Sequence, residues 1–428
     1  MIAILILMSY YIYILKRQEE EIVDMEHIIM GWDYSGDINL VKEKASKTKY
    51  NTVSPIWYHI TGNKTDYKSI GLSIKTKEEY VKLAHKNGYK VWAMLSDGFS
   101  PTRSKLLFDN DEKEDEIITK LVEDVVKNNI DGVNLDFEGD GRKNTQGFLE
   151  FSKKLSDKLK EHDKILSIDV TGYDNFTLSS YYNRKELSKF VDYLCFMGYD
   201  EHWSGSKIAG SVSSIDWVEK NIIRMLEDVP SDKIILSVPF YTRVWRVIED
   251  EVAYVDNTFV NIRLKPNSNS KKLGVANKND FFKFKKEVKG ETVGKSNVWL
   301  EINYEGKIAY IHSNYSSYKN YFKNGRVSTK AYSISRQNKM LRERDDFEIE
   351  YIEEDGQNLA VAVNDDESKY KIWLEDEISI KNRSILVNQY NLAGIAAWRL
   401  NYEDENTWNY YNKYLKETKG MVFSNKNQ

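Results

Sequence analysis

Two carboxylates near residue 137 have the spacing that proton-transfer chemistry requires. Asp136 and Glu138 lie two residues apart at the end of an apolar run, residues 132–137. Side chains two apart on a β-strand point to the same face, so Asn134, Asp136 and Glu138 are expected to share one face. The apolar residues between them would face the other way, toward a hydrophobic layer.

Two carboxyl groups held this close disfavour each other's ionisation. An ionised Asp136 would raise the pKa of Glu138, and a general acid that works near neutral pH needs such an increase. The competing interpretation is structural, because an acidic strand end can also cap the next helix or bind a metal.

Eight short apolar runs recur along the chain and alternate with amphipathic helical stretches. They are more apolar than half-exposed antiparallel strands, and they suit parallel strands that are covered on both sides. The predicted strands are residues 27–32, 52–57, 90–95, 132–137, 165–170, 191–197, 234–240 and 393–398.

Alternating strands and helices predict an α/β fold with a parallel sheet, and eight such units favour closure into a (β/α)8 TIM barrel. Active sites of such barrels lie at the carboxyl ends of the strands, which is where Glu138 is expected. An open, doubly wound sheet is the alternative. However, residues 30–33, at the end of the first strand, are not the Gly-rich phosphate loop common in that class.

The alternation is interrupted between the seventh and eighth predicted strands. An all-β insertion is expected first, and a smaller α+β insertion with a β-rich piece at 347–374 follows it. The predicted segments are 1–26 as a hydrophobic signal or anchor with its linker, 27–248 as the first part of the catalytic barrel, 249–320 as the β insertion and 321–428 as the second part of the barrel.

The string from Asp131 to Glu138 resembles the D-x-x-D-x-D-x-E motif of glycoside hydrolase family 18, the family of chitinases and endo-N-acetylglucosaminidases. Asp131, Asp136 and Glu138 match this motif, whereas Asn134 stands where most chitinases carry Asp. Asn at this position is similar to the branch of spore-associated, cortex-degrading glucosaminidases.

Three later strand ends resemble the same family. Its M-x-Y-D, P-x-Y-x-R and strand-eight tryptophan patterns are matched by Met197 with Tyr199 and Asp200, by Tyr241 with Arg243, and by Trp398. The resemblance covers about residues 27–248 and 321–415.

The resemblance implies a retaining mechanism without a protein nucleophile, in which the acetamido oxygen of the substrate attacks the anomeric carbon. It implies that Glu138 donates the proton, that Asp136 orients the acetamido group and that Tyr199 donates to its oxygen. The other residues predicted to bind substrate are Trp398 as the floor of the sugar subsite, Asn134, Asp131, Met197, Asp200, Tyr241, Arg243 and Trp32. Core packing is the alternative for Trp32, and a structural ion pair and ring for Asp200, Tyr241 and Arg243.

The first insertion, residues 249–320, resembles a bacterial SH3-type module. The matching pieces are residues 260–263 with Pro266 downstream, 299–304, Gly306 and 309–311. Such modules usually bind cell-wall peptides, so a cell-wall peptide is a predicted partner. A purely structural insertion is the alternative.

Bulk composition narrows the partners further. The net charge is −4 with a pI of about 6.0, and this lack of a basic excess argues against nucleic acid as a partner. Cys195 is the only cysteine, so no disulfide can form within the chain. The six histidines show no metal-ligand spacing, and we predict neither a metal nor another cofactor.

Residues 2–15 form an apolar run that is followed by Lys16 and Arg17. The run resembles the apolar part of a signal peptide or signal anchor, and a buried strand is the alternative. We therefore expect an extracytoplasmic protein that is secreted, anchored to the membrane, or associated with the spore or cell wall. We also expect a monomer.

These patterns predict a glycoside hydrolase that cleaves β-linked N-acetylglucosamine in the peptidoglycan of a spore cortex or cell wall. An enzyme that acts on chitin or on N-glycans is the alternative within this class. The alternatives from other classes are a carbohydrate-binding barrel without catalysis and a structural wall protein.

Overall fold

The structure is a computed structural model, and it describes residues 27–45, 50–138, 142–173, 180–206, 208–247, 249–322, 329–364 and 368–419. Side chains of 249–251 and 319–322 are outside this description. The predicted signal or anchor run, residues 2–15, lies outside the described residues. Within the described part of the chain, no helix is long and apolar enough to cross a membrane.

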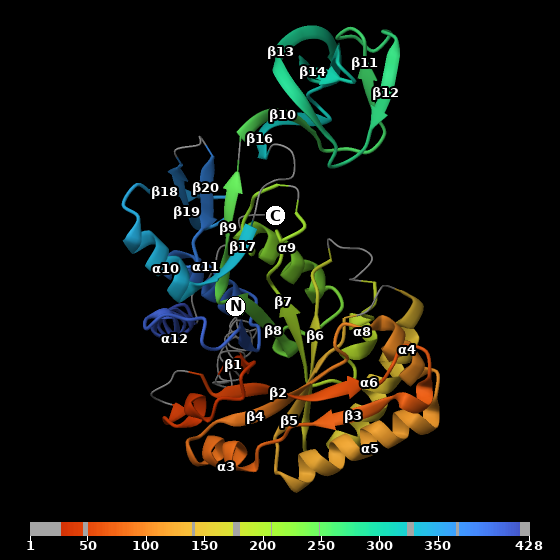
Figure 1. The fold of residues 1–428 in the computed structure, drawn as a ribbon, viewed down its shortest axis with the longest axis vertical. Helices are drawn as coiled ribbons and strands as arrows, with labels where there is room; N and C mark the ends of the chain where they lie inside the picture. The colour runs from red at the N-terminus through yellow and green to blue at the C-terminus, as the bar shows by residue number, and fades with distance from the viewer. Residues whose placement is uncertain are drawn as a thin grey trace, which may run out of the picture.

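A closed ring of parallel strands forms the body of the molecule (Figure 1), which confirms the predicted barrel. Each strand pairs with the next in parallel, and β1 pairs with β2 to close the ring. The eight strands, in ring order, are β1 (Ile28–Asp33), β21 (Gly394–Trp398), β8 (Ile234–Pro239), β7 (Tyr193–Met197), β6 (Ile165–Val170), β5 (Gly132–Asp136), β4 (Lys90–Ser96) and β2 (Thr52–Thr61). An additional short strand, β3 (Gly71–Ile74), runs antiparallel to β2.

Helices cover the outside of the ring. In α5 (Asp111–Lys127), the Asn110 side chain accepts from the Lys113 amide and caps the first turn, while an apolar stripe on the helix faces the barrel. The other helices are α3 (Glu78–Lys86), α4 (Pro101–Phe108), α6 (Thr145–Lys160), α8 (Arg184–Leu187), α9 (Ile215–Leu226), α11 (Glu377–Gln389) and α12 (Thr407–Glu417), with short 3-10 helices η1 (Ile38–Val41), η2 (Tyr67–Ser69), η3 (Arg142–Asn144) and η4 (Ser231–Lys233).

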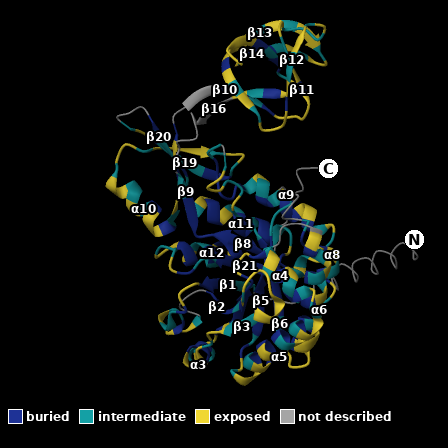
Figure 2. Ribbon diagram, turned by 45° about the vertical axis from the view of Figure 1, so that its right-hand side comes forward, coloured by how far each residue is buried: buried dark blue, intermediate teal, exposed yellow. Residues whose placement is uncertain are grey.

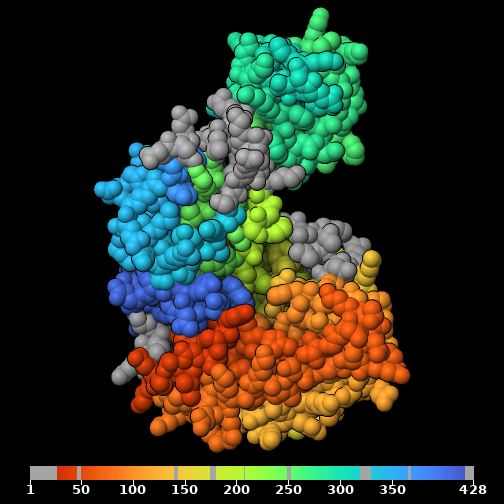
Figure 3. All heavy atoms as spheres, in the orientation of Figure 1, coloured from red at the N-terminus to blue at the C-terminus, as the bar shows by residue number. Residues whose placement is uncertain are grey.

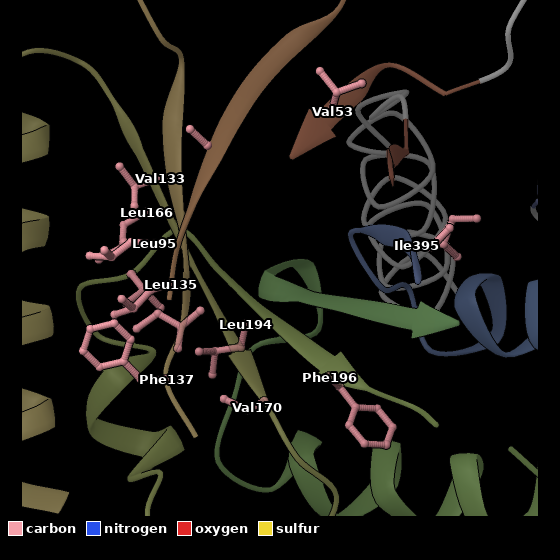
Figure 4. Packing of buried hydrophobic residues seen from close by; sticks show 14 of the residues in the cluster. Val53, Leu95, Val133, Leu135, Phe137, Leu166, Val170, Leu194, Phe196 and Ile395 are labelled. Atoms are coloured by element: carbon pink, nitrogen blue, oxygen red, sulfur yellow. The ribbon is translucent and has the colours of Figure 1, made fainter. Parts of the chain in front are cut away.

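The pleat of the strands divides the core into two layers. Val133, Leu135 and Phe137 lie in the large cluster between the ring and the helices (Figure 4), as the alternation around Asp136 predicted. A smaller cluster fills the inside of the ring and is formed by Met30, Trp32, Trp92, Met94, Cys195, Ile235, Ala393 and Ala396. Figure 2 shows the strands of the ring as the most buried part of the fold.

Two further sheets interrupt the barrel between β8 and β21. The chain leaves the ring at β9 (Tyr241–Val247), which belongs to a five-stranded sheet in the order β17-β9-β20-β19-β18. The other parts of this unit are β17 (Thr329–Ser333), α10 (Ile334–Glu343), β18 (Glu348–Ile352), β19 (Gln357–Val363) and β20 (Lys369–Trp373).

Residues 249–322, here called the β-module, form a seven-stranded sheet in the order β12-β11-β15-β14-β13-β10-β16. Figure 3 shows that this module projects from the rest of the molecule at the end where β9 leaves the barrel. Its strands are β10 (Glu249–Val255), β11 (Val260–Arg263), β12 (Lys272–Ala276), β13 (Phe281–Val293), β14 (Ser296–Tyr304), β15 (Lys307–His312) and β16 (Ser316–Phe322). Its resemblance to an SH3-type module stays a prediction.

A buried ion pair joins the smaller insertion to the barrel. Arg383 on α11 donates to both carboxylate oxygens of Glu375, at 2.5 and 2.9 Å, and to the Ser213 carbonyl at 2.7 Å. Both side chains of the pair are 1% exposed. We expect Arg383→Leu to lower the free energy of unfolding by about 3 to 5 kcal/mol, because it leaves the Glu375 carboxylate buried without its partner.

Denaturant unfolding of the full chain measures this loss. Arg224→Leu is the matched control, since Arg224 forms an exposed ion pair with Glu227 and should contribute less than about 1 kcal/mol. Equal losses of unfolding free energy in the two variants would contradict the prediction that the buried pair contributes more to stability than the exposed pair.

Candidate active site

Polar side chains gather where the parallel strands of the barrel end. Asp136 lies beside Ser96 of β4 in the strand register, and Asn134 lies beside Ser167 of β6. Asp136 lies two residues after Asn134, and Asp169 lies two residues after Ser167. The two carboxyl groups are therefore neighbours on the inside of the ring. Glu138 follows β5 at the mouth of the barrel, where its side chain is half-buried.

The pKa of Glu138 is raised to about 7. Burial is the largest cause, and the negative charges of Asp97 and Asp200 add to it. The sequence predicted an increase but assigned it to Asp136. The two groups do interact, since the charge of Glu138 raises the pKa of Asp136. The structure adds the charges of Asp97 and Asp200, which come from the ends of β4 and β7. A carboxyl with this pKa is partly protonated near neutral pH and can both donate and accept a proton.

Asp136 and Asp169 titrate as a pair. Burial and the charge of Asp169 raise the pKa of Asp136 well above its ordinary value, and Glu138 and Asp97 add to the increase. Burial also raises the pKa of Asp169, to about 7, against the lowering effect of hydrogen bonds from Asn134 and Cys195. Each of these charges disfavours ionisation of the other carboxyl group.

Asn134 lies beneath these carboxyls and is completely buried. Its amide nitrogen donates to Asp169 Oδ1 at 2.9 Å and to Ser167 Oγ at 3.1 Å. Its oxygen accepts from the indole nitrogen of Trp32 at 2.8 Å. These hydrogen bonds of Asn134 are made within the barrel, where they position Asp169 and Trp32, and the contact of Asn134 with substrate stays a prediction.

The two tryptophans predicted to line the cleft lie in contact inside the ring but differ in burial. Trp32 is 1% exposed and belongs to the core inside the ring, which favours core packing over a cleft position. Its ring centroid lies 5.7 Å from that of Trp398, with a tilt of 60°. Trp398 ends β21 and is half-buried, and a cis peptide bond joins it to Arg399. Trp32 thus supports Trp398 from below.

Tyr199 and its neighbours follow β7. The Tyr199 ring meets the Tyr241 ring edge-on, with centroids 6.2 Å apart, and the Tyr241 hydroxyl donates to Asp200 Oδ1 at 2.5 Å. Burial, Asp169, Tyr241 and Asp136 raise the pKa of Tyr199 well above its ordinary value. The Tyr199 hydroxyl therefore keeps its proton and can donate a hydrogen bond beside Asp136.

The remaining predicted residues divide between the two ends of the barrel. Met197 ends β7 and is half-buried, and Arg243 lies on β9, where its charge opposes the increase in the pKa of Tyr241. Asp131 precedes β5, at the opposite end from Glu138, and accepts from the Val91 amide at 2.8 Å and pairs with His85 at 2.7 Å. The structure does not bring Asp131 to the mouth, so its predicted contact with substrate is wrong.

Sequence reasoning missed Asp97, Asp169 and Tyr182. Asp97 follows β4, and its side chain accepts from Ser104 and from the Phe99 amide. The Tyr182 hydroxyl donates to the carbonyl of Phe137, at 3.0 Å, just before Glu138. Asp97 and Asp169 could have been found by searching the ends of the third and fifth predicted strands for polar residues, in addition to the strand ends that carry family patterns.

The comparisons with known proteins agree with this geometry. Residues 10–403 match the model of the glycosyl hydrolases family 18. The chain belongs to this family. As a family 18 glycoside hydrolase, it is 20% identical to the uncharacterized glycosylase YvbX of Bacillus subtilis over 343 residues, which cover 78% of this chain and 77% of YvbX.

Solved structures share the fold of this family 18 enzyme. A chitinase from Chromobacterium violaceum superimposes with a TM-score of 0.65 at 16% identity, covering 91% of this chain and 99% of the chitinase. The spore cortex-lytic enzyme SleL of Bacillus cereus superimposes with a TM-score of 0.64 at 14% identity, covering 90% of this chain and 73% of SleL. Among the described residues, no group of three or more His, Cys, Asp or Glu could hold a metal ion.

Asp97 gives a test of the electrostatics at the mouth. Because the charge of Asp97 raises the pKa of Glu138, Asp97→Asn should lower that pKa. A general acid is active when protonated, so hydrolysis falls as the pH rises through its pKa. We expect the alkaline limb of the pH–rate profile of kcat/KM to lie near pH 7 in the wild type and at lower pH in the variant.

Asp109→Asn is the matched control, since Asp109 forms an exposed ion pair with Lys105 on α4. Its pH–rate profile should equal that of the wild type. An unmoved limb in the Asp97 variant, with retained activity, would show that Asp97 does not act on the proton donor.

Proposed function

We propose that this family 18 enzyme cleaves β-linked N-acetylglucosamine in peptidoglycan, in a spore cortex or a cell wall, by substrate-assisted retaining catalysis. The observation that carries the proposal is Glu138 at the barrel mouth, whose pKa is raised to about 7. Glu138 lies close enough to Asp136 for its charge to raise the pKa of Asp136. The charge of Asp136 in turn raises the pKa of the Tyr199 hydroxyl.

The first step breaks the glycosidic bond. Glu138 donates its proton to the glycosidic oxygen, and the acetamido oxygen of the substrate forms a bond to the anomeric carbon as the leaving sugar departs. Asp136 accepts from the acetamido N–H and stabilises the positive oxazolinium, while Tyr199 donates to the acetamido oxygen. Trp398 supports the sugar ring by stacking.

The second step restores the acetamido group. The Glu138 carboxylate removes a proton from water, the water oxygen bonds to the anomeric carbon, and the bond to the acetamido oxygen breaks. Each displacement inverts the configuration of the anomeric carbon, because the attacking oxygen arrives on the face opposite to the departing one. Two inversions leave the configuration retained. Asp200, Tyr241 and Arg243, adjacent to Tyr199, are proposed to bind sugar hydroxyls.

The likeness to SleL, which is named as a spore cortex-lytic enzyme, supports peptidoglycan as the substrate. Asn134 in place of Asp, and the inserted β-module, support the same choice. The likeness to a chitinase keeps chitin as the second candidate. Peptidoglycan lies outside the cytoplasm, so the proposal includes an extracytoplasmic location and a role for residues 2–15 in targeting. We also propose that the enzyme acts as a monomer.

The β-module contains a cavity of about 280 Å³ that is suited to a small ligand with an apolar part. Its lining includes Arg263 as the charged group and the rings of Phe259, Trp299 and Tyr315. Phe259 is 79% exposed and has a left-handed backbone, with φ of 57°. A non-glycine residue rarely adopts this conformation, so the backbone that exposes the Phe259 ring to solvent is strained. We propose that a cell-wall peptide binds here, with a carboxylate near Arg263.

Glu138→Gln tests the catalytic proposal. We expect kcat on peptidoglycan fragments to fall at least about a hundredfold, because the amide cannot donate the proton, while the thermal midpoint stays unchanged. Mass spectrometry of the wild-type products should show new reducing ends of N-acetylglucosamine. New N-acetylmuramic acid ends would mean the other bond is cleaved, cleavage of chitin oligomers alone would favour the second candidate, and equal inactivity of both proteins would favour a binding protein.

Phe259→Ala tests the peptide site. We expect binding of a soluble cell-wall stem peptide, measured by calorimetry with the full chain, to weaken about tenfold, since the variant removes an exposed aromatic contact. Ile308→Ala is the matched control, because Ile308 is 48% exposed on the same module and lies outside the cavity lining. Equal affinity in both variants would refute a peptide site at Phe259.

A further inference from the structure

The β-module has a charge opposite to that of the whole chain. Residues 249–322 contain eleven lysines, one arginine and nine acidic residues, a net charge of +3, whereas the chain as a whole carries −4. The segment 260–318 within the module contains ten of these lysines, the arginine and five acidic residues, a net charge of +6. The barrel and the smaller insertion are therefore acidic overall, and the positive charge is concentrated on the part of the molecule that projects from the barrel (Figure 3).

The lysines of this segment are unpaired. All ten are exposed, and none forms an ion pair with a residue that the structure describes. They are Lys265, Lys271, Lys272, Lys278, Lys283, Lys285, Lys286, Lys289, Lys295 and Lys307. Barrel lysines differ: Lys120 pairs with Glu116, Lys153 with Asp157 and Lys189 with Glu186, each at 2.6 Å. Solubility alone does not require a module of uncompensated ammonium groups, since the same chain neutralises most helix lysines locally.

Four of these lysines lie on one strand. Lys283, Lys285, Lys286 and Lys289 are exposed along β13, and they span about 20 Å at the rise of an extended strand. Strand β10 pairs with β13 only as far as Lys283, so the later lysines lie where β14 is the paired neighbour among the described strands. The exposed Glu287 lies between Lys286 and Lys289, and Lys285 lies at an irregularity in the pairing of β13 with β14. The strand therefore carries four exposed ammonium groups and one exposed carboxylate, and beyond Lys283 only its β14 edge is paired with a described strand.

We propose that the row of lysines on β13 binds an anionic polymer that is attached to the same wall and carries phosphodiester groups. This inference rests on the proposed function, because it assumes that the enzyme works at a wall. An extended row of like charges fits a linear polyanion, whose charges repeat along its length. Lysine ammonium groups bind phosphate as mobile point charges, whereas a planar carboxylate is better matched by the fork of an arginine such as Arg263.

Co-sedimentation of the full chain with insoluble walls tests the proposal. The walls are used intact, or after hydrofluoric acid has removed phosphodiester polymers, and Glu138→Gln is included in every protein to prevent digestion. We expect binding to intact walls that falls on stripping and falls as salt is raised. The variant K283Q/K285Q/K286Q/K289Q should bind intact walls about tenfold or more weakly, because four exposed charge contacts are lost.

The matched control is K82Q/K120Q/K153Q/K189Q, which removes the same charge from exposed lysines on barrel helices and, for Lys189, in the turn after α8. It should bind walls as the parent does. Equal binding to stripped and intact walls, or equal losses in both quadruple variants, would overturn the proposal. Self-association of the β13 variant in light scattering, with wall binding kept, would also overturn it and would show that these lysines protect a strand edge.

Two further experiments distinguish this proposal from binding to other polyanions and from the proposed catalytic function. Anionic vesicles and duplex DNA, at the same salt concentration, should bind more weakly than intact walls, and tighter binding to either would refute the choice of partner. Hydrolysis of soluble peptidoglycan fragments, measured without the Glu138 change, should be equal in the β13 variant and the wild type. Wall binding without any such hydrolysis would reject the proposed function while keeping the polymer site.

Discussion

Strand β5 is pleated within a closed ring, and the site depends on this constraint. The pleat sends Val133, Leu135 and Phe137 into the layer beneath the helices and leaves the alternate positions on the inside of the ring. A polar residue on the inside of a closed ring can meet only the inward residues of other strands. Burial and like-charge proximity at the mouth follow from closure, and these two effects move the pKa of Glu138 toward neutrality.

The inside of the ring is organised from below by Asn134. One side chain joins Trp32, Ser167 and Asp169 through hydrogen bonds. A second carboxylate in its place would add charge beside Asp136 and Asp169, whose pKa values are already raised. Asn134 instead supplies both a donor to Asp169 and an acceptor for the Trp32 indole, and Trp32 in turn supports Trp398. The neutral amide therefore connects the carboxyl group to the aromatic floor.

The two inserted sheets differ in how they meet the barrel mouth. The chain leaves the ring through β9 directly after β8, which places Tyr241 and Arg243 beside the site before the β-module begins. The module then presents a cavity lined by aromatic rings, and lysines without ion-pair partners among the described residues, on a part of the chain separate from Asp136 and Glu138.

The sequence alone determined the order of strands and helices and the face on which Asp136 and Glu138 lie. Both follow from local patterns, because side chains two residues apart share a face in any β-strand. The family motif at residues 131–138 likewise needed no coordinates. Only the tertiary structure decided that Asp97 and Asp200 raise the pKa of Glu138, since these residues follow other strands, β4 and β7, that closure of the ring brings alongside. It also decided that Asn134 is buried and that Asp131 lies at the far end of β5. A motif records spacing along the chain, whereas pKa values and hydrogen-bond partners depend on distances across the ring, which long-range packing sets.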